Sequence, residues 1–316
     1  MADKIYDTII IGSGVAGFGA AIYAGRFQLK TAIIGEKIGG TIILTNELGN
    51  YPGFKQITGL DLAEKLEEHV KDYDIEIIEK KVTKVEKCKE GGFKVFTKDN
   101  NFHTKTIIFA TGTEWRKLNV PGEKEFTGKG VHYCALCDGA FYKDKIIGVV
   151  GGSNSAAKEA LLLTEYGKKV YIIYRKEKLR AEPVTINRVA ENKKIEIINN
   201  TNVTEIKGDK FVKSVIFDKP YNNSKEFKLD ALFIDIGHIP LSELAKSIGV
   251  KLNEKNEIKI DREAKTNVKG MFACGDVVDN NFKQAITGVA EGVTAAYSAY
   301  HYINENKDIC YLGDEK

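Results

Sequence analysis

Residues 6–17 read Tyr-Asp-Thr-Ile-Ile-Ile-Gly-Ser-Gly-Val-Ala-Gly, a largely apolar run that ends in glycines spaced as G-x-G-x-x-G. The apolar run is typical of a buried parallel strand, and the alanine-rich residues 20–24 favour a helix after the glycines. A second buried strand over residues 31–34 is followed by Glu36, nineteen residues after Gly17. This order is typical of a dinucleotide-binding βαβ unit, because the glycines let the backbone approach a pyrophosphate at the helix N-terminus. Glu36 either accepts hydrogen bonds from ribose hydroxyls or only caps a loop.

The same order of elements returns in the second half of the chain. A buried strand over residues 145–150 leads into Gly-Gly-Ser-Asn-Ser-Ala at 151–156, an alanine-rich helix to Tyr166 and a strand over residues 170–174. Each half then continues with an alternating segment typical of an antiparallel meander and with a buried strand that ends in glycine. These segments are residues 75–102 and 106–112 in the first half, and residues 196–230 and 231–237 in the second.

The repeat predicts two domains, and 316 residues are enough for two separate cores. We expect an α/β fold of two Rossmann-like three-layer nucleotide-binding domains, with the second inserted into the first. The first domain is predicted over residues 1–114 plus 244–316, and the inserted domain over residues 115–243. The long last helix, predicted from Gln284 to about residue 304, is rich in small residues and belongs to the first domain.

Composition excludes several classes of protein. A net charge of +3 is too small to argue for nucleic acid or an anionic membrane as a partner. No stretch of eighteen apolar residues is present, so we expect no membrane span. The first four residues lack the regions of a signal peptide, and five cysteines make no disulfide framework, so a reducing cytoplasm is predicted.

The segment Cys134-Ala135-Leu136-Cys137-Asp138 carries the chemistry. Two cysteines separated by two residues form either a redox disulfide or half of a zinc site. The other cysteines and the nearest histidines offer no second pair of zinc ligands at close spacing: Cys88, Cys274, Cys310, His103 and His132. We therefore predict a redox disulfide and no metal. Its place between two nucleotide-binding units suggests that electrons pass from a nucleotide through a flavin to the disulfide.

Together these motifs resemble those of the low-molecular-weight thioredoxin reductases, which are FAD-dependent pyridine nucleotide-disulfide oxidoreductases. The resemblance covers essentially the whole chain, and the cysteine pair lies in the inserted domain, as in the low-molecular-weight type. The matching segments are Gly12-x-Gly14-x-x-Gly17, Gly39-Gly40, Asn50-Tyr51-Pro52-Gly53, Ala110-Thr111-Gly112, Cys134-x-x-Cys137-Asp138-Gly139, Gly237-His238-Ile239-Pro240, Gly275-Asp276-Val277 and Lys283-Gln284-Ala285.

The resemblance implies a flavoprotein thioredoxin-disulfide reductase that passes electrons from NADPH through FAD and the Cys134/Cys137 disulfide to thioredoxin or a thioredoxin-like protein. Cys137 would exchange electrons with the flavin, and Cys134 would attack the partner's disulfide as a thiolate. Asp138 would protonate the departing thiolate, which requires burial to raise its pKa; the alternative role for Asp138 is a helix cap. A homodimer is implied as well, and so is a rotation between the domains about residues 113–117 and 241–247.

The resemblance also implies two sets of cofactor-binding residues. The first glycine turn would hold the FAD pyrophosphate, and the N-terminus of the last helix would stabilise the negative charge of a reduced flavin. The expected FAD residues are Gly12, Gly14, Ala16, Gly17, Glu36, Gly40, Thr41, Asn50, Thr111, Gly112, Gly275, Asp276, Gln284 and Ala285. The expected NADPH residues are Gly152, Ser153, Asn154, Ser155, Arg175, Lys176 and Arg180.

The second nucleotide site departs from the family pattern in two places. Ser153 replaces the second fixed glycine, where a Cβ would crowd a pyrophosphate. The family's H-R-R-x-x-x-R becomes Tyr-Arg-Lys-Glu-Lys-Leu-Arg at residues 174–180, and lysine keeps the charge but not a two-pronged contact. No acid ends this strand, which favours NADPH over NADH. Reduction by ferredoxin or a deazaflavin instead of NADPH, and a flavin dithiol oxidase, remain as alternatives.

Overall fold

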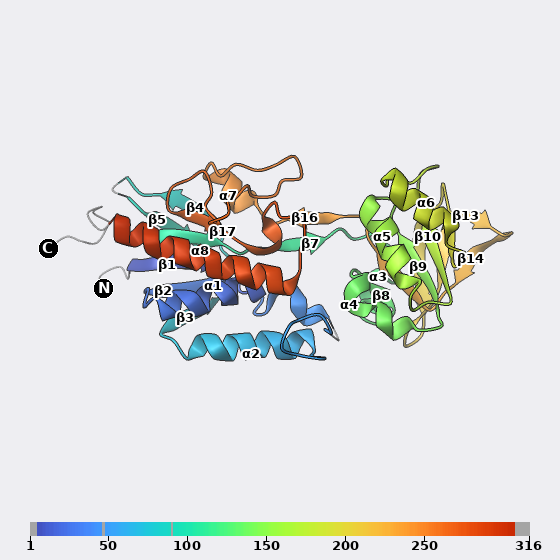
Figure 1. The fold of residues 1–316 in the computed structure, drawn as a ribbon, viewed down its shortest axis with the longest axis horizontal. Coiled ribbons are helices and arrows are strands. Elements are labelled where there is room, and N and C mark those ends of the chain that lie inside the picture. Colours follow the sequence, from blue (N-terminus) through green and yellow to red (C-terminus); the bar gives the residue numbers. More distant parts are fainter. Residues whose placement is uncertain (1–4, 46–47, 90, 307–316) are drawn as a thin grey trace. The chain divides into compact units, whose positions relative to one another are not determined.

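The computed structural model describes residues 5–45, 48–89 and 91–306, which form two compact units (Figure 1). The first unit comprises Met1–Leu44, Tyr51–Glu114 and Ile239–Lys316, and the second comprises Trp115–His238 together with Thr45–Asn50. The second unit ends at residue 238 rather than at the predicted residue 243. The reason is that Leu241 and Ser242 are bound into the first unit. The Leu241 N–H donates to the Gly112 carbonyl at 3.0 Å, and the Ser242 hydroxyl donates to the Asn256 carbonyl at 2.6 Å.

The first unit is built on one sheet in the order β3-β2-β1-β6-β5-β4, with β17 also paired to β6. Its strands are β1 (Ile5–Ile11), β2 (Thr31–Gly35), β3 (Ile75–Glu79), β4 (Lys84–Lys87), β5 (Phe93–Phe96), β6 (Asn101–Phe109) and β17 (Met271–Ala273). Its helices are α1 (Val15–Arg26), α2 (Gly59–Lys71), α7 (Glu243–Ser247) and α8 (Ala285–Glu305), with 3-10 turns η1 (Gly40–Leu44) and η3 (Gly275–Val277). Two short strands, β7 (Thr113–Trp115) and β16 (His238–Pro240), pair where the chain crosses between the units.

The prediction of one antiparallel meander over residues 75–102 is wrong in its first part. Strand β3 pairs in parallel with β2, so it belongs to the parallel sheet, and only β4, β5 and the start of β6 are antiparallel. The second predicted meander, residues 196–230, is wrong in the same way, because β11 (Ile195–Ile198) pairs in parallel with β10 (Lys169–Ile173). Alternation along a half-buried strand does not reveal the direction of its neighbour, so the sequence pattern could not separate these cases.

Both faces of the first sheet are buried. Ile9 and Ile11 of β1 pack into a cluster with residues of β4, β5 and α7, while Ile10 packs on the other face with α1 and α8. Helices α1 and α8 lie side by side (Figure 1), and they approach so closely that a Cβ at Gly292 would be 2.2 Å from the Ala16 carbonyl oxygen. The small residues of α8 are therefore explained by packing against α1.

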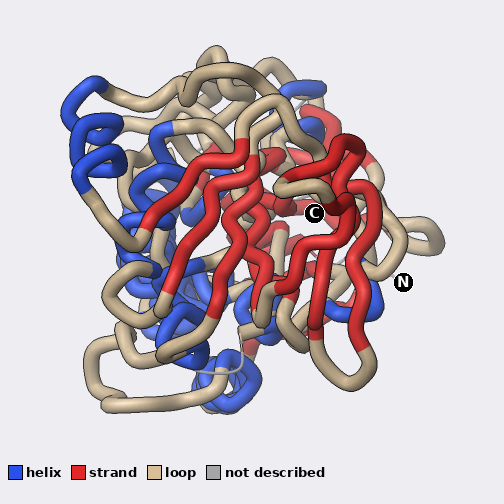
Figure 2. The backbone as a smooth tube through the Cα atoms, turned by 90° about the vertical axis from the view of Figure 1, so that its right-hand side faces the viewer, coloured by secondary structure: helices blue, strands red, loops and turns tan. Residues whose placement is uncertain are grey.

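The second unit repeats this plan. Its parallel sheet has the order β11-β10-β9-β15-β8, and an antiparallel sheet β12-β13-β14 covers one face while helices cover the other. The elements not yet given are β8 (Val131–His132), β9 (Ile146–Val150), β12 (Val203–Gly208), β13 (Val212–Tyr221), β14 (Ser224–Lys228), β15 (Ala231–Ile234), α3 (Glu123–Phe126), α4 (Ala135–Asp138), η2 (Gly139–Tyr142), α5 (Asn154–Leu163) and α6 (Pro183–Glu191). The predicted pair of three-layer α/β domains is confirmed, and Figure 2 shows the helices and strands that make up the backbone.

Strand register gives the residue-by-residue correspondence between the two βαβ units. Ile11 pairs with Ile34 in the first unit, and Val150 pairs with Ile173 in the second. Counting onward from these pairs makes four positions equivalent. They are Gly12 and Gly151, Gly14 and Ser153, Gly35 and Tyr174, and Glu36 and Arg175. The two glycine turns can therefore be compared position by position.

Candidate active site

The two cysteines of the C-x-x-C segment form a disulfide between Cys134 and Cys137. Cys134 is the N-cap of the short helix α4, and its Sγ accepts the Cys137 N–H at 3.2 Å. Both cysteines are half-buried, and between them Leu136 is 46% exposed. The disulfide is thus held by the backbone of α4 while one side of it remains open to a reacting group.

Asp138, the last residue of α4, is buried and belongs to a chain of three polar side chains. One of its carboxyl oxygens lies 3.0 Å from His132 Nδ1, and His132 Nε2 lies 2.7 Å from the Tyr142 hydroxyl. With Asp138 ionised, Nδ1–H donates to the carboxylate and Nε2 accepts the tyrosine proton. Burial, with a smaller contribution from the charges of Asp138 and Asp230, raises the pKa of Tyr142 to about 12, so the phenol remains a proton donor at neutral pH.

Asp138 has two further properties that suit a proton carrier. Its other oxygen, Oδ1, is buried and has no hydrogen-bond partner among the described residues. Asp138 ends α4 and is the N-cap residue of the 3-10 turn η2, but its side chain makes no capping hydrogen bond there. Because Asp138 directly follows Cys137 in the sequence, its unpartnered carboxyl oxygen makes it the candidate proton carrier for the disulfide.

Two more acids with buried oxygens lie near the cysteine helix or next to one another: Glu159, which contacts the helix, and Asp235, whose charge acts on Glu159. Glu159 of α5 accepts the Ala135 N–H through Oε1 at 3.3 Å, and its Oε2 is buried without a partner among the described residues. Asp235, next after β15, is 6% exposed, and its Oδ2 is buried in the same way. Burial first, and then the charge of Asp235, raises the pKa of Glu159 to about 8. Glu159 therefore keeps its proton at neutral pH.

The first glycine turn places glycines at its three closest backbone positions and forms a cradle, the group of residues around Gly12, Gly14 and Gly17. Gly12 has a φ of +118°, and a Cβ there would lie 2.2 Å from the Ala110 carbonyl oxygen. A Cβ at Gly17 would lie 1.9 Å from the Gly12 carbonyl oxygen, so the turn and α1 touch directly. At Gly14, by contrast, a Cβ would meet no protein atom closer than 3.8 Å. The space at Gly14 is therefore free of protein atoms, as a bound pyrophosphate requires.

Several other predicted FAD residues gather around this cradle within the first unit. Gly40 and Thr41 start η1, and a Cβ at Gly40 would lie 3.0 Å from the Gly14 Cα. Ala16 is buried, and a Cβ at Gly275 would lie 2.8 Å from its side chain, which brings the Gly275–Asp276 turn onto the start of α1. Glu36 follows β2 and is exposed, with Lys81 at 3.4 Å.

The remaining FAD residues have simple positions. Gln284 is the N-cap of α8 and Ala285 its first residue, as predicted. Thr111 and Gly112 follow β6, and Gly112, with a φ of +68°, would have no atom within 4 Å of a Cβ. Asn50 is exposed and lies in the short segment grouped with the second unit.

Two side chains outside the predicted cofactor-binding residues hold the Gly275–Asp276 turn. Glu291 of α8 accepts the Gly275 N–H at 2.8 Å, and the Lys283 ammonium donates to the Asp276 and Val278 carbonyls at 2.6 and 2.7 Å. Lys283 also pairs with Glu257 at 2.9 Å. The turn is thereby fixed before any ligand arrives.

The second glycine turn differs from the first in its side chains. Ser153 has an extended backbone, and its Oγ accepts the Ala156 N–H at 3.2 Å, which caps α5. Gly152 and Ser153 lie on the turn, Asn154 and Ser155 begin α5, and Arg175, Lys176 and Arg180 follow β10 as exposed residues. Ser153 and Arg180 form a β-bridge, as Gly14 and Gly39 do in the first unit. The predicted NADPH residues are therefore brought together.

Comparison with known proteins assigns the chain to a family. Residues 6–292 match the family described as pyridine nucleotide-disulphide oxidoreductase. The chain belongs to this family. A thioredoxin reductase of Bacillus subtilis (strain 168) is 39% identical over 307 residues, 96% of each chain, and one of Peptoclostridium acidaminophilum is 37% identical over 96% of this chain and 99% of that protein. The crystal structure of thioredoxin reductase from Streptococcus pyogenes MGAS5005 is 37% identical, covers 96% of this chain and 99% of that one, and superposes with a TM-score of 0.88. The family predicted from the motifs is confirmed.

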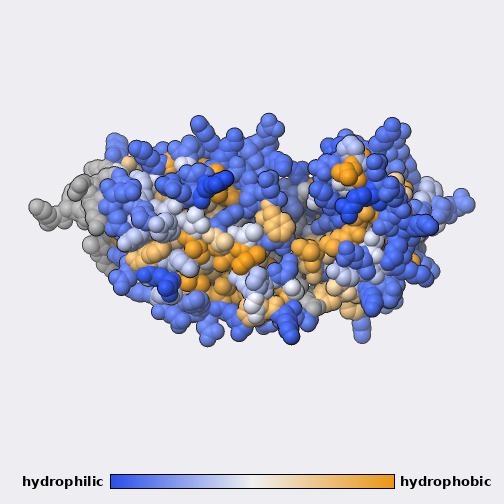
Figure 3. Space-filling model, viewed as in Figure 1, coloured by the Kyte–Doolittle hydropathy of each residue, from blue (hydrophilic) through white to orange (hydrophobic). Residues whose placement is uncertain are grey.

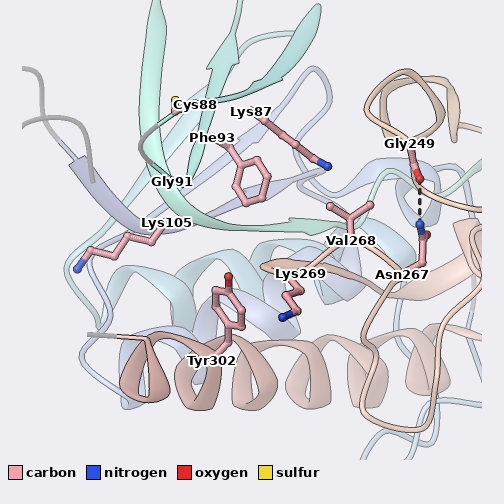
Figure 4. Close-up of a pocket in the computed structure, with 11 residues that line it drawn as sticks. Lys87, Cys88, Gly91, Phe93, Lys105, Gly249, Asn267, Val268, Lys269 and Tyr302 are labelled. Carbon is pink, nitrogen blue, oxygen red and sulfur yellow. Dashed lines mark hydrogen bonds between the residues drawn. The ribbon is translucent and has the colours of Figure 1, made fainter. Parts of the chain in front are cut away.

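A hollow of about 480 Å³ in the first unit is separate from these sites (Figure 4). Lys87, Phe93, Lys269 and Tyr302 line it, and the Asn267 side chain at its edge donates to the Gly249 carbonyl at 3.0 Å. None of the predicted site residues lines it, so we do not place the reaction there.

Other classes of site find no support in the described part of the chain. Within residues 5–45, 48–89 and 91–306, no group of three or more His, Cys, Asp or Glu side chains is placed to hold a metal ion. In the same residues no helix is long and apolar enough to cross a membrane. Cys274 is fully buried, and burial raises the pKa of its thiol, so it is inert at neutral pH. Cys310 lies outside the described residues.

Proposed function

We propose that the protein is a thioredoxin-disulfide reductase that passes electrons from NADPH through FAD and the Cys134–Cys137 disulfide to thioredoxin. The observation that carries the proposal is the disulfide at the N-terminus of α4, in a unit that has its own dinucleotide turn. Relatives named thioredoxin reductase over nearly the full chain support the same activity. FAD and NADPH are the forms of the flavin and nicotinamide cofactors that the site residues fit.

FAD fits the first unit. The open space at Gly14 and the fixed Gly275–Asp276 turn would accept its pyrophosphate and ribityl chain, and the N-terminus of α8 at Gln284 would offer N–H groups to the flavin. Glu36, exposed at the end of β2, would accept the ribose hydroxyls. When bound, FAD supplies the electron pair that opens the disulfide.

NADPH fits the second unit. Arg175 occupies the position equivalent to Glu36, so a cation stands where the first unit has an acid. With Lys176 and Arg180 it would bind a 2′-phosphate, which an acid at this position would repel. When bound, NADPH supplies the hydride that reduces the flavin.

The cysteines then perform thiol–disulfide exchange. The Cys134 thiolate attacks one sulfur of the thioredoxin disulfide, forms a mixed disulfide and releases the partner's other sulfur as a thiolate. Asp138 would take up the proton that Cys134 loses on forming its thiolate and give that proton to the departing thioredoxin thiolate; the Cys137 thiolate then attacks the Cys134 sulfur, closes the disulfide and releases the second thioredoxin sulfur as a thiolate. His132, held by Tyr142, would steady the Asp138 carboxylate through its Nδ1–H. Exposed Leu136 and Phe141, each 46% exposed, would contact the partner around the disulfide.

We also propose a homodimer in the cytoplasm. Figure 3 shows apolar surface over the α8 face of the first unit, the kind of surface that a second copy could cover. A reducing compartment suits a disulfide that must open in each cycle. Size-exclusion chromatography with light scattering tests the dimer, and fractionation of cells tests the compartment.

The experiment that tests the function is steady-state reduction of thioredoxin with NADPH, NADH and reduced ferredoxin as competing donors, with oxygen uptake followed in parallel. We expect turnover with NADPH, little with NADH, and little oxygen consumption. Turnover with reduced ferredoxin but not with NADPH would show that ferredoxin is the donor. Rapid oxygen uptake with a dithiol would identify an oxidase.

A further inference from the structure

The two glycine turns fill the space beneath them in opposite ways. In the first unit the space between the turn and the end of β2 is filled by Ser13, a residue of the turn, since a Cβ at Gly35 would lie 2.2 Å from the Ser13 Oγ. In the second unit the equivalent space is filled by Tyr174, the residue after β10, since a Cβ at Gly152 would lie 2.2 Å from Cε2 of the Tyr174 ring. Gly35 and Tyr174 are equivalent positions, as are Ser13 and Gly152. In the first unit the glycine is therefore at the strand end and the side chain on the turn, and in the second unit the reverse holds.

Tyr174 lies under the turn and does not block it. Its side chain is 5% exposed, whereas a ring that plugged an open nucleotide site would present one face to solvent. The ring packs against Gly152, and the backbone N–H of Tyr174 donates to the Ile198 carbonyl at 2.9 Å. The aromatic ring is therefore the floor of the turn, and its hydroxyl lies at the edge of the site.

That hydroxyl holds Arg180. Arg180 Nε–H donates to the Tyr174 hydroxyl at 3.1 Å, and the Arg180 backbone N–H donates to the Gly152 carbonyl at 2.7 Å. Two residues later, the Glu182 N–H donates to the Asn154 side chain at 3.2 Å. Residues 180–182 are therefore hydrogen-bonded to the second glycine turn and the start of α5. Nε uses one of the five guanidinium donors, so the four donors at the two Nη atoms remain for an anion.

We propose that Tyr174 is a positioning residue that sets the preference of this site for a nucleotide with a 2′-phosphate, by holding the Arg180 guanidinium through its hydroxyl. The inference rests on the proposed function and concerns the donor site alone. A long side chain that is fixed before binding loses less conformational freedom when it contacts the phosphate, and the gain appears only for the ligand that carries the phosphate. Arg175 and Lys176 are exposed beside it and supply charge.

The test compares 2′,5′-ADP with 5′-AMP as probes, because they differ only in the 2′-phosphate. Both are titrated calorimetrically into the FAD-loaded wild type, Tyr174→Phe, Arg180→Ala and the double variant. Tyr174→Phe keeps the ring that floors the turn and removes only the hydroxyl. Tyr171→Phe, on the same strand β10, is the matched control for loss of a tyrosine hydroxyl. Because FAD is proposed to bind the other unit, circular dichroism of each variant, and not its bound FAD, reports whether the second unit is folded.

We expect the wild type to prefer 2′,5′-ADP and Tyr174→Phe to lose about three- to ten-fold of that preference, with 5′-AMP affinity unchanged. Arg180→Ala should lose more, and adding Tyr174→Phe to it should change nothing further, because the hydroxyl then has no arginine to hold. An unchanged preference in Tyr174→Phe, or an equal loss for both probes, overturns the role of Tyr174 while NADPH use stands. A wild type that binds the two probes equally overturns the 2′-phosphate site itself.

Discussion

Glu159→Gln should make the protein more stable than wild type at pH 8, although it removes a charge beside the redox cysteines. The glutamine side chain would be neutral at every pH, and its carbonyl oxygen could still accept the Ala135 N–H that Glu159 accepts now. The wild-type carboxyl, by contrast, must lose its proton in a buried place next to Asp235. The substitution therefore removes a titration and keeps the contact.

The size of the effect follows from the two protonation equilibria. The pKa of Glu159 is about 8 in the folded protein, whereas that of a glutamate fully exposed to water is 4.5. Between these values the folded chain binds a proton that the unfolded chain releases, so the free energy of unfolding falls as pH rises. The slope is at most about 1.4 kcal/mol per pH unit, which bounds the total at about 5 kcal/mol. The contribution is fully present below about pH 4.5 and is lost as the pH rises to about 8.

The assay is thermal unfolding of the FAD-loaded protein, followed by circular dichroism, from about pH 5 to about pH 8.5. We expect the two midpoints to be close at pH 5 and Glu159→Gln to be several degrees higher at pH 8. Glu165→Gln, an exposed acid that follows the same helix, is the control and should track the wild type. Parallel curves for wild type and Glu159→Gln would show that Glu159 titrates normally and would refute the reasoning.

Five further substitutions test the site. Gly14→Val should leave the chain folded but colourless, because its Cβ would meet no protein atom closer than 3.8 Å and the side chain would fill the space proposed for the FAD pyrophosphate; yellow protein with one FAD per chain would contradict this. Cys134→Ser and Cys137→Ser should each abolish thioredoxin reduction while FAD stays bound, and Asp138→Asn should slow only the exchange step seen in stopped flow. Activity in either serine variant would make the disulfide structural. Ser153→Gly should cost only a few tenths of a kcal/mol in helix capping, and it should strengthen NADPH and NADH binding alike, measured by titration of the flavin spectrum; weaker binding of both would show that the hydroxyl helps.

The sequence alone was enough for the family and the plan of the fold. Strand–glycine–helix order repeats at Gly12 and Gly151 because a parallel βαβ unit needs buried strands and a tight turn wherever it occurs. The cysteine pair was equally visible, because its chemistry requires neighbours in sequence. The boundary at His238 and the direction of β3 were not visible, since both depend on hydrogen bonds between residues distant in the chain.

Only the tertiary structure revealed the side chains that support the site. His132, Tyr142 and Glu159 meet around Asp138 and Ala135 although they come from a strand, a 3-10 turn and a helix. Nothing in their local sequence marks them, because burial and an unpartnered oxygen arise only when separate elements pack together. The exchange of Ser13 and Gly35 for Gly152 and Tyr174 is of the same kind. None of these four residues forms a recognisable sequence motif with its partner. The space that Ser13 fills in one unit and Tyr174 in the other exists only after two strands have paired in the folded sheet.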